Sequence, residues 1–358
     1  MQRSSYGSLI ELSADSFLKR AYGWLQEGIG GEIVEFFKKL KEENERKIDL
    51  IVDFGQVRAV LDEKDVRLRI PLYGDYPLTD WAHEQLAEKL GIPKRYYSRM
   101  REEKPDLLLQ NINAWLCEMA GERKFVRILN GRIRAILSDR YRVIDNYDVL
   151  LVALQEFRRI GSVEIYRIDL TEKMMYLKAL DRTLKAEIRQ DDIVCGGIII
   201  RNSEVGAGAF RVEPFILRLV CENGLIVKQV LRRIHLGRQM DEGLWSRETM
   251  ELEDRVLFLK VRDVIRATFD RQVFKRWVSK LKESTEIEIE NPVETAKNVA
   301  KLTGLTEEQE KELLAYFTEH TKYGLINAIT TLAREMKNVD ERIKLEEFGG
   351  RILEGEVI

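Results

Sequence analysis

Residues 124–137, KFVRILNGRIRAIL, combine four basic side chains with a tight turn, a set of residues suited to binding phosphates. Asn130-Gly131 predicts a two-residue β-hairpin turn, because a type I′ turn requires positive φ at both central residues. That turn would set Ile128 opposite Ile133 on an apolar face and Arg127 opposite Arg134 on a cationic face. Like charges that face each other across two strands repel, and a phosphate backbone bound there would relieve the repulsion. The hairpin therefore predicts nucleic-acid binding and identifies no reaction.

A second basic stretch, KQVLRRIHLGR at 228–238, contains no acidic residue. Guanidinium groups bind phosphates well, and single strands also stack their bases on aromatic side chains. The predicted phosphate ligands are Lys124, Arg127, Arg132, Arg134, Arg140, Lys228, Arg232, Arg233, His235 and Arg238, and the predicted base-stacking residues are Phe125 and Tyr141. The alternative for both stretches is an ordinary solvated surface.

Two further patterns give alternative sites. Residues 85–101 have the spacing of a helix-turn-helix, which would place the basic residues of 94–101 on a helix that reads duplex DNA. Cys221, Asn223 and His235 would suit nucleophilic catalysis, although Cys221 lies in an apolar strand and Asn223 suits a turn. The three cysteines and three histidines show no paired metal-ligand spacing, and no phosphate-loop or dinucleotide fingerprint occurs. We therefore expect no catalytic residue, no metal and no cofactor.

Charge is unevenly distributed along the 358 residues, although the net charge is only −2. Residues 122–142 and 201–238 are basic, whereas residues 283–319 contain ten glutamates and three lysines and could recruit a protein partner. The high content of Lys, Arg and Glu resembles that of heat-adapted proteins. With no apolar run of membrane-spanning length and no apolar leader, we expect a cytoplasmic protein that does not contact membranes.

Hydrophobic periodicity predicts an α+β fold that would position these residues. Alternating patterns predict strands at 48–54 and 66–72, and 163–170 and 174–180 are expected to form a pair of strands. The apolar run 193–200 predicts a central buried strand. Residues 214–221 lead to Asn223-Gly224, which suggests a second hairpin turn, although residues 225–236 could equally be helical. Helical patterns predict helices within 13–46, at 80–90 with Thr79 as its cap, from Pro105 to Met119, at 146–159 and as one long element over 247–282. The expected regions are a mixed N-terminal region (1–120), a central antiparallel β-rich core with hairpins (121–242) and a helical C-terminal region (243–358).

Several stretches resemble one family of phage/plasmid-like proteins, domain-of-unknown-function family nine hundred thirty-two. They are LTDWAHEQLAEKLGIPKRYY, NINAWL, LSDRYRVIDNYDVL, IIIRNSEVGAGAFRVEPFILRLVCENGLIV with RRIHLGR, and YGLINAIT. The resemblance implies a mobile-element setting and no particular activity. By outline alone, the expected hairpin-plus-helix core is also similar to Rad52-like single-strand annealing proteins.

These observations lead to one expected function and three alternatives. We expect a non-enzymatic, oligomeric protein that binds single-stranded DNA (or RNA) and anneals or protects strands during phage-type recombination. The alternatives are a duplex-DNA regulator, an uncharacterised enzyme centred on Cys221 and His235, and a structural protein that binds another protein.

Overall fold

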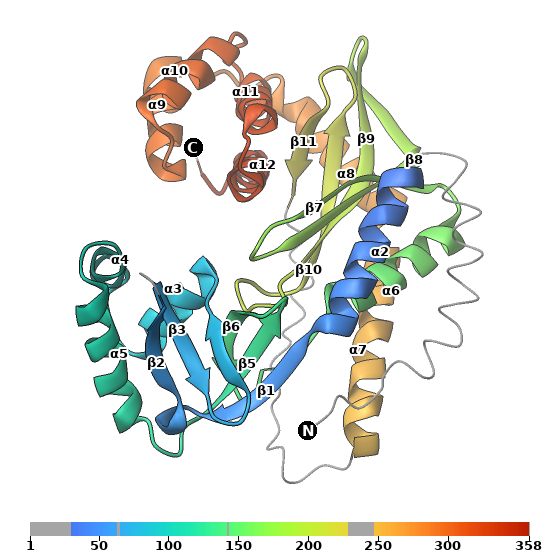
Figure 1. The fold of residues 1–358 in the computed structure, drawn as a ribbon. Helices are drawn as coiled ribbons and strands as arrows, with labels where there is room; N and C mark the ends of the chain where they lie inside the picture. The colour runs from blue at the N-terminus through green and yellow to red at the C-terminus, as the bar shows by residue number, and fades with distance from the viewer. Residues whose placement is uncertain (1–29, 63–64, 142, 228–246, 358) are drawn as a thin grey trace.

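The computed structural model describes residues 30–62, 65–141, 143–227 and 247–357, and it has the expected α+β fold (Figure 1). Every pair of strands within its three described sheets is antiparallel. None of the helices in the described part of the chain is both long enough and apolar enough to cross a membrane.

The N-terminal lobe contains two three-stranded sheets and three helices. After α2 (Gly30–Arg46), its elements are β1 (Ile48–Asp53), β2 (Arg58–Asp62), β3 (Asp65–Ile70), β4 (Gly74–Pro77), α3 (Asp80–Lys89), α4 (Lys94–Glu103), α5 (Pro105–Glu118), β5 (Arg123–Leu129) and β6 (Arg132–Ser138). The sheet orders are β1-β5-β6 and β2-β3-β4. Thr79 caps α3 by accepting a hydrogen bond from the Ala82 amide, as its sequence position predicts.

The hairpin of β5 and β6 forms at Asn130-Gly131, and its register differs from the predicted one. Asn130 and Gly131 both have positive φ, and Ile128 pairs with Ile133 as expected. The register of the two strands shifts between Arg127 and Ile128, so that Arg127 pairs with Ala135. The expected pairing of Arg127 with Arg134 is therefore wrong. A β-bulge takes up one extra residue in one strand, and here it separates the two arginines.

A five-stranded sheet, ordered β11-β10-β9-β8-β7, forms the centre of the molecule. Its strands are β7 (Val163–Leu170), β8 (Met175–Arg189), β9 (Asp192–Asn202), β10 (Arg211–Arg218) and β11 (Asn223–Ile226), and α6 (Asn146–Ile160) precedes them. The middle strand β9 is almost entirely buried, as its continuous apolar sequence predicts.

The turn between β10 and β11 corrects a second prediction. The turn lies at 219–222, and Asn223 and Gly224 are the first residues of β11. Asn223 is buried, and its amide donates a hydrogen bond to the Thr331 hydroxyl at 2.7 Å. A methyl group on Gly224 would lie 2.7 Å from the Phe215 ring, so this glycine allows close packing rather than a turn.

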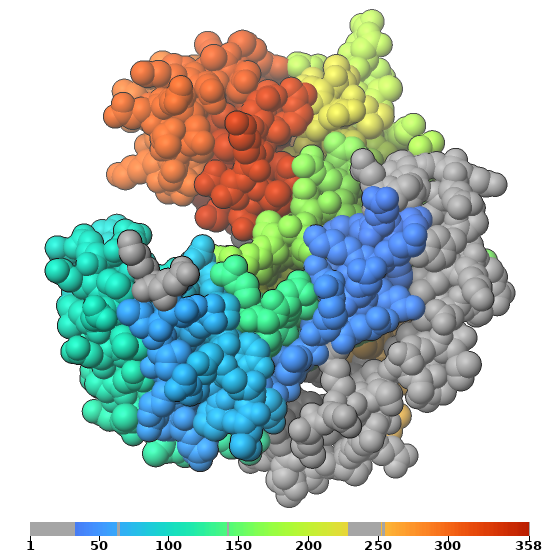
Figure 2. All heavy atoms as spheres, in the orientation of Figure 1, coloured from blue at the N-terminus to red at the C-terminus, as the bar shows by residue number. Residues whose placement is uncertain are grey.

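Helices cover both faces of the five-stranded sheet. The C-terminal helices are α7 (Arg247–Thr268), α8 (Arg271–Ser284), α9 (Pro292–Thr303), α10 (Glu307–Tyr316), α11 (Lys322–Glu335) and α12 (Val339–Glu354). The long element expected over 247–282 is divided, because Asp270 caps a new helix by accepting from the Gln272 amide. Figure 2 shows a hollow between the N-terminal lobe and the orange and red surface of the C-terminal helices.

Candidate functional site

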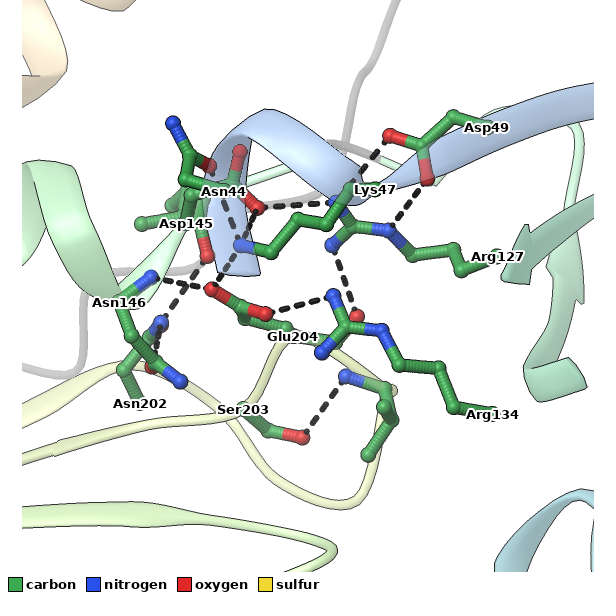
Figure 3. Close-up of polar contacts among 12 residues, drawn as sticks. Asn44, Lys47, Asp49, Arg127, Arg134, Asp145, Asn146, Asn202, Ser203 and Glu204 are labelled. Carbon is green, nitrogen blue, oxygen red and sulfur yellow. Dashed lines mark hydrogen bonds and ion pairs between the residues drawn. The ribbon is translucent and has the colours of Figure 1, made fainter. Parts of the chain in front are cut away.

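Six charged side chains meet where the N-terminal lobe joins the central sheet (Figure 3). We call this set the polar seam: Lys47, Asp49, Arg127, Arg134, Asp145 and Glu204. Lys47 follows α2, Asp49 lies on β1, and the two arginines lie on β5 and β6. Asp145 is the N-cap residue of α6, and Glu204 lies in the loop between β9 and β10. The seam therefore joins elements from both parts of the fold.

Glu204 is at the centre of the polar seam. One carboxylate oxygen accepts hydrogen bonds from Lys47 Nζ and from the Asn146 backbone amide, each at 2.6 Å. The other accepts from the Arg134 guanidinium at 2.6 Å. Burial alone would raise the pKa of Glu204, but the charges of Lys47, Arg134 and Arg127 hold it below its ordinary value. Glu204 is thus an ionised carboxylate at the positive N-terminal end of α6.

Arg127 lies wholly inside the molecule, so its expected position on a solvent-facing cationic ribbon is wrong. Its guanidinium donates to both carboxylate oxygens of Asp49, at 2.9 and 3.1 Å, and to Asp145 at 2.8 Å. It also donates to the Glu204 carbonyl at 3.0 Å. Burial lowers the pKa of Arg127, but the three surrounding carboxylates outweigh it and raise that pKa. This arginine is fully engaged within the protein, and a phosphate could reach it only after rearrangement.

The polar seam balances three cations with three carboxylates. A buried charge needs such partners, since an isolated one is strongly disfavoured away from water. The geometry therefore supports a structural role in fixing the two parts of the fold together. In the described part of the chain, no group of three or more His, Cys, Asp or Glu residues is placed to hold a metal.

The other predicted hairpin residues have mixed surroundings. Lys124 pairs with Glu122 at 2.8 Å, and exposed Arg132 donates to the Leu78 carbonyl at 3.0 Å. Arg140 is exposed. The rings of Phe125 and Tyr141 stack on each other with centroids 6.5 Å apart, and both are partly buried. The Tyr141 hydroxyl donates to the Ser203 carbonyl, so these rings help to hold the loop that carries Glu204.

The second predicted basic stretch lies in a part of the chain that the structure does not describe. Lys228, Arg232, Arg233, His235 and Arg238 all lie outside the described residues.

The helix expected to read duplex DNA is α4, and most of its cations are in ion pairs. Lys94 pairs with Glu84, and Arg99 pairs with Glu103. Arg101 is bound by Asp65 and Asp80 at 2.7 and 2.9 Å.

The alternative enzyme site is only partly described. Cys221 is partly buried, and its sulfur accepts a hydrogen bond from Arg218 at 3.4 Å. The proposed partner His235 lies outside the described residues. The side-chain amide of Asn223 donates its hydrogen bond to Thr331 within the core.

A cationic surface that the sequence reasoning missed lies on α8. We call it the α8 basic face: Arg271, Lys275, Arg276, Lys280 and Lys282. All five side chains are exposed, and within the described part of the chain none is in a salt bridge. Lys280 lies 4.9 Å from the ring centre of the half-buried Trp277. The signal was present in the sequence as five cations without an acid from 271 to 282, at helical spacing.

The apolar side of α8 fixes this orientation. Val273, Phe274 and Leu281 are buried, and Phe274 packs closely against Gly196 of β9. A helix with one apolar side buries that side and turns the other to solvent. The five cations are thus presented on a helix that rests on the central sheet.

The fold and the polar seam define an α+β protein whose two parts are joined by buried ion pairs. A family model described as Domain of unknown function (DUF932) matches residues 135–344, more than half of the chain. The chain therefore belongs to that family. Neither the curated proteins nor the solved structures contain a match. Asp145 and Glu204 lie within the matched residues, whereas the three cations of the seam precede them.

Proposed function

We propose that this protein binds single-stranded nucleic acid through the α8 basic face, without catalysing a reaction. The observation that carries the proposal is a helix face with five exposed cations and, among the described residues, no carboxylate bound to them. The cations of the polar seam, in contrast, are neutralised by carboxylates of the protein itself. The half-buried ring of Trp277 beside Lys280 adds an aromatic surface of the kind on which bases stack.

The spacing of the cations suits a strand that runs along α8. From Arg271 to Lys282 the helix axis covers about 16 Å, at about 1.5 Å per residue. Binding of this kind reads the backbone charge and depends little on base sequence. Annealing or protection of strands, in DNA or RNA, is the corresponding biological role that we propose.

The test is fluorescence anisotropy of a labelled oligonucleotide, single-stranded and duplex, over a series of salt concentrations. Each phosphate contact on a single strand contributes about −0.7 to the slope of log K against log salt, so four contacts predict about −3. Lys275→Ala with Arg276→Ala should make this slope shallower by about 1.4 and weaken binding to every sequence.

The matched control is Lys297→Ala with Lys301→Ala on α9. Both lysines are exposed, so this variant has the same change in net charge at a different place. It should bind as the wild type does. Equal loss in both variants would mean that only net charge matters, and no binding at low salt would refute the proposal.

A further inference from the structure

Helix α10 has a strongly charged surface of the opposite sign. We call it the α10 acidic face: Glu307, Glu308 and Glu312. The three side chains are exposed, and exposed Lys311 lies beside Glu307 and Glu308 on the same side of the helix, which leaves two net negative charges there. Within the described residues none of the four is in a salt bridge. Tyr316 follows Glu308 and Glu312 at four-residue spacing, and its ring is 39% exposed. This face therefore combines carboxylates with a partly exposed aromatic side chain.

The α8 basic face and the α10 acidic face complement each other. Cations at Arg271 and Lys275, and at Arg276 and Lys280, are four residues apart, as are Glu308 and Glu312. Side chains four residues apart lie on one side of a helix, so the four cations form two separate rows on the solvent side of α8, and the two glutamates form one row on α10. The two helices also have similar lengths, 14 and 10 residues. Trp277 and Tyr316 add an aromatic ring to each face.

The two faces do not meet within one chain. No ion pair between α8 and α10 occurs among the described residues. Figure 1 places α10 among the helices at the edge of the molecule, whereas α8 lies against the central sheet. A contact between the faces therefore requires a second molecule.

We propose that the α10 acidic face of a second copy occupies the α8 basic face, and that single-stranded nucleic acid displaces it. The displacement rests on the proposed function, whereas the self-association does not. The contact joins unlike surfaces, so a dimer keeps one α10 acidic face free on one copy and one α8 basic face free on the other. Such head-to-tail contacts extend into rings or open chains. Exposed ion pairs are individually weak and are screened by salt, so the assembly should form at low salt and high protein concentration.

The test is light scattering with size-exclusion chromatography on the full-length protein and two charge-reversed variants. One variant changes Lys275, Arg276 and Lys280 to Glu, and the other changes Glu307, Glu308 and Glu312 to Lys. The wild type should exceed the mass of one chain at low salt and return to it at high salt. Each variant alone should have the mass of one chain, and an equimolar mixture should assemble again. The mixture can assemble because each reversed face meets a face of opposite charge.

The control variant, Lys297→Glu with Lys301→Glu, should assemble like the wild type. A wild type with the mass of one chain under all conditions would overturn the self-association, even if a variant failed to fold. Assembly that both reversed variants retain would overturn the choice of faces.

An unlabelled single-stranded oligonucleotide is then added to the assembled wild type. A fall to single chains with bound oligonucleotide supports competition, and bound oligonucleotide on an intact assembly overturns it. An intact assembly that binds no oligonucleotide would refute the proposed function and leave the self-association standing.

Discussion

Lowering the pH should destabilise this protein through His83, which is buried on α3 between β3 and α4. Its Nδ1 is 2.8 Å from the Tyr97 hydroxyl, and its Nε2 is 3.6 Å from an Asp65 oxygen. Burial, together with the nearby charge of Arg101, outweighs the attraction of Asp65 and Asp80 and lowers the pKa of His83 from 6.5 to about 4. The imidazole is therefore neutral in the folded protein at neutral pH.

The sign of the effect follows from where the proton binds. Between pH 6.5 and about 4, the unfolded chain binds a proton at His83 and the folded chain does not. The free energy of unfolding therefore falls as the pH falls through this window, and the loss is complete near pH 4. A pKa difference of about 2.5 units, at about 1.36 kcal/mol per unit, gives a loss of about 3 kcal/mol.

Urea unfolding of the wild type and His83→Gln, measured from pH 7.5 to pH 4, isolates this contribution. The difference between their free energies of unfolding should change by about 3 kcal/mol across the window, because the other titrating groups are common to both. Tyr97→Phe, which removes the hydrogen bond but keeps the buried imidazole, should retain the pH dependence of the wild type. Parallel curves for the wild type and His83→Gln would refute the reasoning.

Three further predictions concern stability and thiol reactivity. Arg127→Leu should lower the free energy of unfolding by about 3–5 kcal/mol in urea titrations, since it leaves buried carboxylates without their guanidinium; a loss below 1 kcal/mol would contradict the role of the polar seam. Gly197→Ala should destabilise more than Gly121→Ala, because its new methyl group would lie 2.1 Å from a backbone carbonyl of β8, whereas Gly121 (φ +81°) has open space around it; equal melting temperatures would disprove this. A thiol reagent should modify exposed Cys117 in the folded protein, but it should modify Cys195 only on unfolding, because Cys195 is buried and burial raises the pKa of its thiol. Mass spectrometry of the labelled peptides measures both rates. Rapid labelling of Cys195 without denaturant would contradict its burial.

Local patterns predicted much of the fold. The Asn130-Gly131 turn, the Thr79 cap and the buried strand β9 each depend on residues close together in the chain. The register of β5 and β6 could not be predicted in the same way, because the bulge moves Arg127 toward Asp49 and Asp145, which are distant in sequence. The hairpin sequence alone therefore does not indicate whether its arginines face water or are paired with carboxylates from other parts of the chain.

The candidate sites were predictable to different degrees. No pattern indicated that Glu204, in a loop between two strands, would hold Lys47 and Arg134. Such a contact depends on tertiary packing rather than on any local period. The α8 basic face, in contrast, could have been found by helical spacing once Asp270 was recognised as the start of a new helix.

The polar seam also has a consequence for the order in which a nascent chain can fold. Arg134 and its carboxylate partner Glu204 are 70 residues apart, and Lys47 and Glu204 are 157 residues apart. At about 5–20 residues per second, the ribosome would need roughly 4–14 seconds to add Glu204 after Arg134. During that interval the N-terminal lobe has two basic side chains whose principal carboxylate does not yet exist. We expect the N-terminal lobe to reach its final packing only after the loop between β9 and β10 has been synthesised. Folding of this lobe is then completed only once the strands on both sides of that loop are translated.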